Sequence, residues 1–292
     1  MTDYQGSVVR EGLTFGEGPR WHDGRLWYSD FWDHAVHAFT PGGGDERVVE
    51  VAGQPSGMGW MPDGSLLIVS MTDRRVLRLS PDGALSEHAD LTGWAPFHCN
   101  DMVVDAAGRA YVGHFGFDIY PRMAGESVGP EPRLATLIRV DPDGQVSVAA
   151  EDMAFPNGTV ITPDGQTLII GESGGRRLTA FDVAADGGLS NRRVWADLAP
   201  HQVGPDGICL DASGAVWVAN AGGPIAVRVA EGGELLDVAQ FSQTCYACML
   251  GGADGRELYA MTAPSALPAR AAASRQGKIE SVRVGVGHAG LP

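Results

Sequence analysis

The chain has 292 residues, of which 44% are hydrophobic and 20% are charged, a composition typical of globular proteins and not of disordered or fibrous ones. Its 36 acidic residues outnumber its 21 basic residues, and the net charge of -15 repels phosphate backbones and anionic membrane surfaces. We therefore expect neither a nucleic-acid partner nor a membrane partner.

Cysteine content and the N-terminal segment bear on the cellular compartment. The four cysteines are too few for a disulfide scaffold, so we expect free thiols at Cys99, Cys209, Cys245 and Cys248. Segment 1–12 lacks the apolar core of a signal peptide, and no stretch approaches the roughly 20 apolar residues needed to cross a bilayer. These features predict a cytoplasmic protein, and they leave its oligomeric state open.

In chain order, six segments share one pattern, in which a turn built on Asp-Gly or a similar pair joins two short apolar stretches. These segments are 21–30, 60–70, 103–114, 161–172, 209–220 and 250–261. Each predicts a β-hairpin, because the turn residues tolerate positive φ and the flanks have the length and composition of strands. Further pairs of strand-like stretches follow at 74–90, 136–151 and 176–196, so each repeat contains about four strands.

The spacing of the repeats predicts the fold. The turn glycines lie 40 to 57 residues apart, near the roughly 40 to 50 residues of a four-stranded propeller blade. No segment shows helical periodicity bounded by caps, which argues against an α/β fold. We therefore predict an all-β single domain over residues 1–292, a six-bladed β-propeller with four-stranded antiparallel blades around a central channel. The first strand-like segment, 7–13, and the last, 278–285, are expected to complete one blade together.

Equivalent positions of the repeats should form a ring, because the innermost strand of each blade runs along the channel. Counting back seven residues from the first turn glycine and eight from each of the others gives Glu17, Ser56, Asn100, Asn157, Asp206 and Ala247. Four of these side chains are carboxylates or carboxamides, each expected at a turn just before an apolar strand. Such a set of oxygen donors suits Ca²⁺ and, less well, Mg²⁺ or Mn²⁺. The ring therefore predicts a divalent metal ion at the mouth of the channel.

Several stretches around these positions have a familiar form. They are Glu-Gly-Pro-Arg-Trp at 17–21, Asn-Asp at 100–101, and the longer stretches 156–168, 205–219 and 244–263. Together they resemble the SMP-30/gluconolactonase/LRE-like group of six-bladed propellers, also called regucalcin-like, over nearly the whole chain.

This resemblance implies a metal-dependent hydrolase that opens a lactone, a cyclic ester. It implies one divalent ion held by Glu17, Asn157 and Asp206, with Asn100 as a substrate contact or a fourth ligand, as in related phosphotriesterase-like propellers. Ca²⁺ is the leading candidate, with Zn²⁺, Mg²⁺ and Mn²⁺ as alternatives. The predicted catalytic residues are Asp206 and Asn100. Asp206 either activates the attacking water as general base or serves only as a metal ligand.

The residues around Asn100 bear on the substrate. Sugar-lactone members of the group usually have an arginine two residues before this asparagine, where this chain has His98. A polyhydroxylated substrate would therefore lack the several hydrogen-bond donors that a guanidinium group offers. The long aromatic segment 115–133 is expected to form a lid or pocket wall. The predicted substrate contacts are Asn100, His98, Phe97, Phe115 and Phe117. Both a sugar lactone and a more apolar lactone stay open.

Two alternative functions also remain. One is an esterase or a phosphotriesterase-like hydrolase acting at the same metal. The other is a non-enzymatic propeller that binds calcium or another ligand, which would be favoured if segment 115–133 plugged the channel mouth. The enzymatic alternatives share a small-molecule lactone or ester as the substrate.

Overall fold

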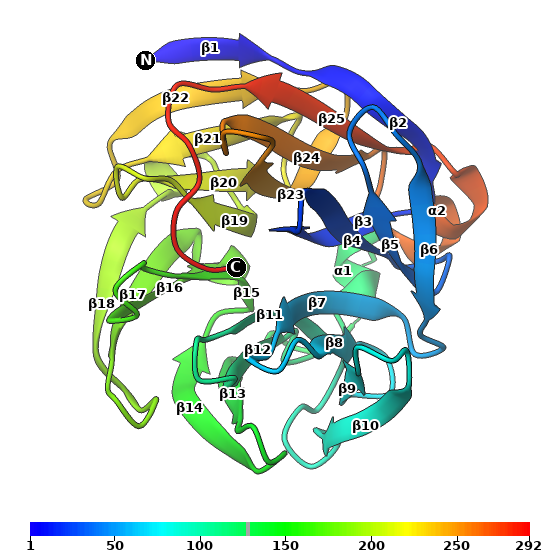
Figure 1. Ribbon diagram of the computed structural model, residues 1–292. Coiled ribbons are helices and arrows are strands. Elements are labelled where there is room, and N and C mark those ends of the chain that lie inside the picture. Colours follow the sequence, from blue (N-terminus) through cyan, green and yellow to red (C-terminus); the bar gives the residue numbers. More distant parts are fainter. Residues whose placement is uncertain (127–128) are drawn as a thin grey trace.

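The computed structural model describes residues 1–126 and 129–292. They form six small sheets of antiparallel strands arranged in a ring (Figure 1). About 6% of the chain is helical. The predicted all-β fold, a six-bladed β-propeller, is therefore confirmed.

The predicted hairpins supply the two innermost strands of every blade. The innermost strands, in blade order, are β3 (Gly16–His22), β7 (Pro55–Trp60), β11 (Cys99–Val104), β15 (Pro156–Ile161), β19 (Pro205–Leu210) and β23 (Thr244–Gly251). The second strands are β4 (Arg25–Asp30), β8 (Leu66–Ser70), β12 (Ala110–His114), β16 (Thr167–Glu172), β20 (Val216–Asn220) and β24 (Glu257–Ala263). These inner strands are mostly buried, which explains why their sequences are the most continuously apolar.

Two further strands complete each blade on its outer side. The third strands are β5 (Ala35–Phe39), β9 (Arg75–Leu79), β13 (Ala135–Val140), β17 (Arg177–Val183), β21 (Ile225–Val229) and β25 (Gly277–Arg283). The outermost strands are β6 (Asp45–Glu50), β10 (Leu85–Asp90), β14 (Val146–Met153), β18 (Leu189–Asp197), β22 (Leu235–Gln240) and β2 (Ser7–Leu13). Most residues of the outermost strands are exposed or half-buried.

The two ends of the chain close the ring. Strand β2 pairs antiparallel with β25, so the first and last strand-like segments complete the sixth blade, as predicted. A further strand that the sequence did not predict, β1 (Thr2–Gln5), pairs parallel with β22 and extends the fifth blade. The N-terminal segment therefore spans the last two blades.

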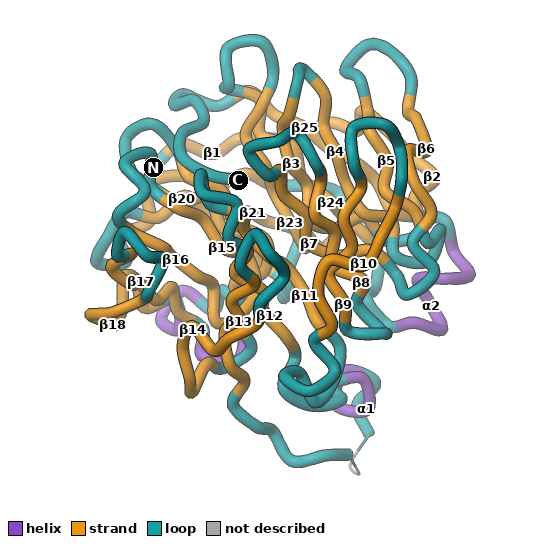
Figure 2. The backbone as a smooth tube through the Cα atoms, turned by 60° about the horizontal axis from the view of Figure 1, so that its bottom comes forward, coloured by secondary structure: helices purple, strands orange, loops and turns teal. Residues whose placement is uncertain are grey.

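The two faces of the ring differ. Helices α1 (Tyr120–Met123) and α2 (Pro268–Ser274) lie on one face, whereas the C-terminal segment crosses the other (Figures 1 and 2). The C-terminal segment is held there by backbone hydrogen bonds between Leu291 and Ile161 at the end of β15. Two 3₁₀ turns complete the helical elements, η1 (Ser173–Gly175) and η2 (Ala199–His201). None of the described helices has the length and apolar character to span a bilayer.

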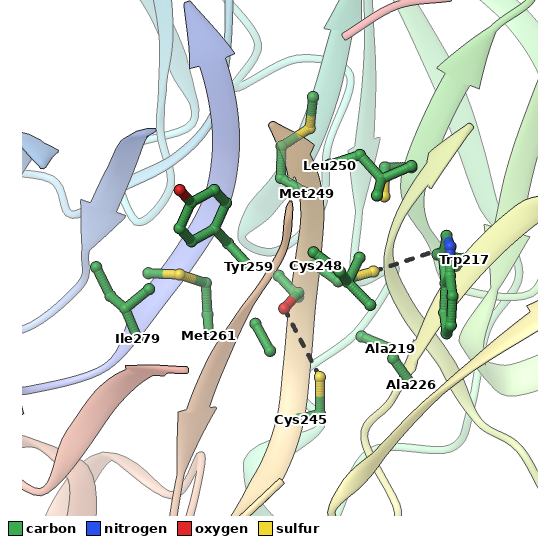
Figure 3. Close-up of a cluster of buried hydrophobic side chains, with 14 of the residues drawn as sticks. Trp217, Ala219, Ala226, Cys245, Cys248, Met249, Leu250, Tyr259, Met261 and Ile279 are labelled. Atoms are coloured by element: carbon green, nitrogen blue, oxygen red, sulfur yellow. Dashed lines mark hydrogen bonds between the residues drawn. The ribbon is translucent and has the colours of Figure 1, made fainter. Parts of the chain in front are cut away.

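Buried apolar side chains fill the space between blades, and the cysteines are part of this core. Figure 3 shows the cluster between the fifth and sixth blades, where the Cys248 thiol donates to the Trp217 carbonyl oxygen at 3.6 Å. All four cysteines are buried and free, as expected. Burial raises the pKa of the Cys99 thiol to about 12. The four cysteines are therefore part of the buried core.

Candidate metal centre and substrate cavity

A cavity of about 400 Å³ lies beside helix α1, whose Tyr120 and Met123 line it. All four predicted oxygen donors line it: Glu17, Asn100, Asn157 and Asp206. They come from the inner strands of the first, third, fourth and fifth blades. The structure therefore brings together four side chains that are up to 189 residues apart in sequence, from Glu17 to Asp206.

Each of the four lies at an irregularity of its inner strand. The register with the neighbouring strand shifts between Glu17 and Arg20, and equivalent shifts occur at Cys99/Met102, Pro156/Thr159 and Pro205/Ile208. A β-bulge bends the strand and re-aims the side chain of the extra residue. The sequence predicted turns that precede the strands. The structure corrects this: the four residues belong to β3, β11, β15 and β19.

Close packing of the inner strands explains the glycines after Asn157 and Asp206. A Cβ atom on Gly158 would lie 2.4 Å from the Asp206 carbonyl oxygen, and one on Gly207 would lie 2.5 Å from the Ala247 Cβ. Only glycine fits at these contacts between neighbouring blades. The Asn-Gly and Asp-Gly pairs thus report a close approach of strands and not a turn.

A short hydrogen-bond chain sets the orientation of Asn157. Its Nδ2 donates to the Ser173 hydroxyl oxygen at 3.1 Å, and the Ser173 hydroxyl donates to the Pro205 carbonyl oxygen at 2.6 Å. An amide nitrogen only donates, so this chain commits Nδ2 to Ser173. The amide oxygen of Asn157 is then the atom left to serve a cation.

On another side of the cavity, Asn100 has a neighbour at an equivalent repeat position. The Ser56 hydroxyl donates to Asn100 Oδ1 at a long 3.4 Å. Both side chains are more than nine-tenths buried. Ser56 is not among the described residues that line the cavity. It therefore supports the ring only through its contact with Asn100.

The two carboxylates of the ring have no basic partner among the ion pairs of the described residues. Glu17 accepts a hydrogen bond from the Gly18 backbone N–H at 3.0 Å. Burial, followed by the charges of Asp206 and Asp101, raises the pKa of Glu17 well above its ordinary value. Burial raises the pKa of Asp206 to about 8, with Asp101 adding to this and the Asn157 amide opposing it. Ionising both of these side chains at once is therefore unfavourable in the metal-free protein.

This donor set fits a divalent cation. A dication would offset the repulsion between Glu17 and Asp206, and the amide oxygens of Asn100 and Asn157 would complete a set of hard oxygen donors. The described residues contain no group of three or more His, Cys, Asp or Glu side chains that could hold a metal. A cation at this ring would thus depend on the two amides as well as on the two carboxylates.

Aromatic side chains form the wall of the cavity. Seven of the lining residues are aromatic: Phe15, Phe31, Trp32, Phe115, Tyr120, Phe155 and Tyr246. Segment 115–133, of which residues 127 and 128 lie outside the described part, contributes Phe115, Ile119, Tyr120, Arg122 and Met123 to the lining. The segment is therefore part of the wall, and the cavity beside it is not filled.

The predicted aromatic contacts are only partly in this wall. Phe115 lines the cavity, whereas Phe97, His98 and Phe117 are not among its described lining residues. Phe97 and His98 stack with ring centroids 3.9 Å apart, and each lies about 6 Å from Tyr120, which does line the cavity. Burial lowers the pKa of His98. Phe97 and His98 thus form a second layer that supports Tyr120.

Other residues of the site were missed by the sequence reasoning. Phe15 and Phe155 each stand two residues before a ring residue, so the repeat alignment that found the ring also contained a signal for them. Ser173 lies in a Gly-x-Ser-x-Gly stretch that predicts only a blade loop, and the structure places it in η1 at the cavity. Its hydrogen bond to Asn157 has no counterpart in sequence spacing.

Comparison with known proteins defines the family. Residues 15–264 match the model of the SMP-30/gluconolactonase/LRE-like region. The chain belongs to this family. Among family relatives, pentonolactonase of Haloferax volcanii is 29% identical over 262 residues, which cover 88% of this chain and 84% of that protein. The 6-deoxy-6-sulfogluconolactonase of Pseudomonas putida is 26% identical over 86% of this chain and 84% of its own length.

Solved structures of the family share the fold. Regucalcin of Agrobacterium tumefaciens, described as a calcium-binding protein, superposes with a TM-score of 0.80 at 21% identity, covering all of this chain and 98% of the other. A luciferin-regenerating enzyme superposes with a TM-score of 0.81 at 22% identity, covering 98% of each chain. At these identities the likeness establishes the common architecture.

Proposed function

We propose that residues 1–292 form a single-domain, metal-dependent lactonase that hydrolyses a cyclic ester. The observation that carries the proposal is the ring itself: two carboxylates without basic partners and two amides, all lining one cavity. Membership of a family that includes a pentonolactonase and a sulfogluconolactonase supports the reaction class. The buried, free thiols suit work in a reducing compartment such as the cytoplasm.

The ring residues have distinct tasks in this proposal. Glu17, Asn157, Asp206 and Asn100 would hold one divalent ion, with Ca²⁺ preferred and Zn²⁺, Mg²⁺ and Mn²⁺ as alternatives. When bound, the ion would supply a Lewis acid for the ester carbonyl oxygen. Asn100 also faces the space where the ester would lie, so its amide nitrogen can donate to the substrate.

Asp206 is the candidate that handles the proton of the attacking water. Its carboxylate lines the cavity beside the other ring residues, within reach of a water between the ring and the substrate. In hydrolysis the water oxygen bonds to the carbonyl carbon, the ring C–O bond breaks, and the leaving alkoxide takes up a proton to give a hydroxy acid. Asp206 would accept the water proton and return it to that oxygen, or serve only as a ligand.

An open cavity favours catalysis over a purely structural ion, because about 400 Å³ beside the ring leaves room for a substrate. The esterase and phosphotriesterase-like alternatives use the same cavity. Non-enzymatic calcium binding uses the same ring but has no need for the aromatic wall.

Chelator-treated protein is expected to lose lactone hydrolysis and to recover it with a divalent metal. The assay compares gluconolactone, alkyl- and aryl-substituted lactones, p-nitrophenyl acetate and a phosphotriester, without metal and with Ca²⁺, Mg²⁺, Mn²⁺ or Zn²⁺. Metal-restored opening of any lactone supports the proposal. Hydrolysis of only the open-chain ester or the phosphotriester would replace it by the corresponding alternative, and no hydrolysis with bound Ca²⁺ would favour a binding protein.

Ser173→Ala is expected to weaken metal binding, raising the Kd for Ca²⁺ by about 10- to 100-fold, because Asn157 loses the group that orients its amide. Calorimetric titration of Ca²⁺ into chelator-treated protein measures this. Ser173→Thr keeps a hydroxyl and should restore most of the affinity, while Ser86→Ala on the exposed surface of β10 should leave it unchanged. Unaltered affinity in Ser173→Ala would remove Ser173 from any positioning role.

A further inference from the structure

The chemistry of the cavity wall restricts the substrate beyond the ester group. Outside the ring, the side chains that line the cavity are aromatic or aliphatic except for Ser173 and Arg122. The Ser173 hydroxyl is already engaged with Asn157 and the Pro205 carbonyl oxygen. Arg122 is half exposed, and its guanidinium lies 3.8 Å from the Glu131 carboxylate. Neither residue is therefore well placed to bind hydroxyl groups deep in the cavity.

The two tyrosines in the wall add few hydrogen-bonding groups to the cavity. Tyr246 also lines the cavity with one hydroxyl, and Trp32 adds one indole N–H that has no hydrogen-bond partner among the described residues. The Tyr120 hydroxyl is one group, whereas a sugar lactone carries several hydroxyls that each need a partner when water is removed. His98 stacks on Phe97 and is not among the described residues that line the cavity. The described wall thus offers a few isolated polar groups, fewer than the hydroxyls of a polyhydroxylated ring would need.

The aromatic wall is also built as a continuous surface. Phe115 packs edge-to-face against Phe155 with ring centroids 4.8 Å apart, and Phe15 packs against Tyr246 at 4.8 Å. Phe155 adopts a φ of 58°, a left-handed conformation that is unfavourable for an aromatic residue. Such a conformation persists where the surroundings impose it, and here it accompanies a ring that lines the cavity.

We propose that the substrate is a lactone whose ring carries an apolar alkyl or aryl substituent. The inference rests on the proposed lactonase function. The ester lies at the polar ring of Glu17, Asn100, Asn157 and Asp206, and the substituent packs against the aromatic wall. Apolar surface of the substituent leaves water on binding, and no hydroxyl group is left without a partner.

Residues of helix α1 and its N-terminal flank determine this specificity. Ile119 and Met123 line the cavity from segment 115–133, and both are accessible enough to be changed without opening the core. Met123 is 42% exposed. Ile119 packs against the same apolar cluster as Phe97 and Tyr120. Polar replacements of Ile119 or Met123 should weaken the binding of the substituent and leave the binding of the ester group unchanged.

The first experiment compares a matched pair of lactones with the metal-loaded protein. A γ-lactone with a medium-length alkyl chain is expected to have a kcat/KM about 100-fold higher than a polyhydroxylated γ-lactone, the order of discrimination seen when an apolar pocket meets an added hydroxyl. Equal rates, or preference for the polyhydroxylated ring, would overturn the inference while leaving the lactonase proposal intact.

Variants of the wall test the residues directly. Ile119→Asn and Met123→Gln are each expected to lower kcat/KM for the alkyl lactone about tenfold relative to unsubstituted γ-butyrolactone. Leu134→Gln is the matched control, because Leu134 is 58% exposed and is not a described lining residue. If kcat/KM falls by the same factor for both substrates in the two wall variants, Ile119 and Met123 do not recognise the substituent.

Binding of a substrate analogue that is not hydrolysed tests the substrate class separately from the proposed lactonase function. Lactams resist hydrolysis, so calorimetry with an alkyl-substituted γ-lactam and a polyhydroxylated γ-lactam reports the wall alone. Tighter binding of the alkyl lactam supports the substrate class even if no lactone is hydrolysed, in which case only the proposed function fails. Tighter binding of the polyhydroxylated lactam, or no binding of either, would overturn the substrate class.

Discussion

Asp206→Asn is expected to lower kcat/KM for lactone hydrolysis by about 1,000-fold or more, equivalent to about 4 kcal/mol of transition-state stabilisation. The substitution keeps the size and shape of the side chain but removes one of the two negative charges at the ring. Both roles considered for Asp206, ligand and general base, depend on that charge. Steady-state kinetics at a metal concentration that saturates the parent protein measure the loss.

The same variant should have a distinctive effect on stability. In the metal-free protein the pKa values of Glu17 and Asp206 are both raised, so ionising both groups is unfavourable, and replacing Asp206 by the neutral asparagine should leave the melting temperature equal or higher. The parent protein should gain about 2.7 kcal/mol when Ca²⁺ is present at 100 times its Kd, whereas the variant should gain little. Thermal unfolding with chelator and with Ca²⁺ tests both expectations.

Asp23→Asn provides a matched control for the change of charge. Asp23 is 86% exposed on a hairpin turn, at a φ of 49° that asparagine readily adopts. This variant should retain the activity and the Ca²⁺ response of the parent protein. Full activity and full Ca²⁺ stabilisation in Asp206→Asn would show that the metal site does not lie at this ring.

The repeats explain why the sequence predicts so much of this fold. Each hairpin has its own local signal, and the recurrence of these signals at the length of a four-stranded blade indicates a propeller. Alignment of the repeats also predicts that Glu17, Asn100, Asn157 and Asp206 face the channel, because equivalent positions in a ring converge on its axis. The structure brings all four to one cavity, although spacing alone says nothing about which ion they hold.

The wall of the cavity is less predictable, because loops build a large part of it. Phe97 and His98 precede a ring residue as Phe15 and Phe155 do, yet they stack on each other beside Tyr120 and are not described lining residues. Segment 115–133 has no counterpart in the other blades, so no alignment could say which of its aromatic side chains face the cavity. Phe115 does, whereas Phe117 is not among the described lining residues.

Long-range polar contacts are a second kind of feature that cannot be predicted from the sequence. Arg20 belongs to the Glu-Gly-Pro-Arg-Trp stretch at 17–21, where it carries no sign of its partners. In the structure its guanidinium donates to the Met58 and Met102 carbonyl oxygens at 2.9 and 2.6 Å, and to the Asp101 carboxylate at 2.6 Å. One side chain of the first blade therefore holds the inner strands of the second and third.

Arg20→Met is expected to destabilise the protein by about 3 to 5 kcal/mol. Arg20 is 3% exposed, so its loss leaves the Asp101 carboxylate and two backbone carbonyl oxygens buried with fewer partners. Methionine fills much of the space of the arginine stem, so lost packing is a minor part of the effect. Urea unfolding in the presence of chelator measures the change without a contribution from metal binding.

A double variant separates the free-energy cost of leaving the Asp101 charge without its partner from the cost of replacing the arginine side chain. Arg20→Met with Asp101→Asn should be less destabilised than Arg20→Met alone, because the amide carries no charge that needs the guanidinium. Arg283→Met, which breaks the exposed ion pair with Asp254, should have little effect in the same assay. If the double variant is as unstable as the sum of its single variants, the contact with Asp101 is not what holds the inner strands. The hydrogen bonds from Arg20 to the Met58 and Met102 carbonyl oxygens would then hold the inner strands of the first three blades together.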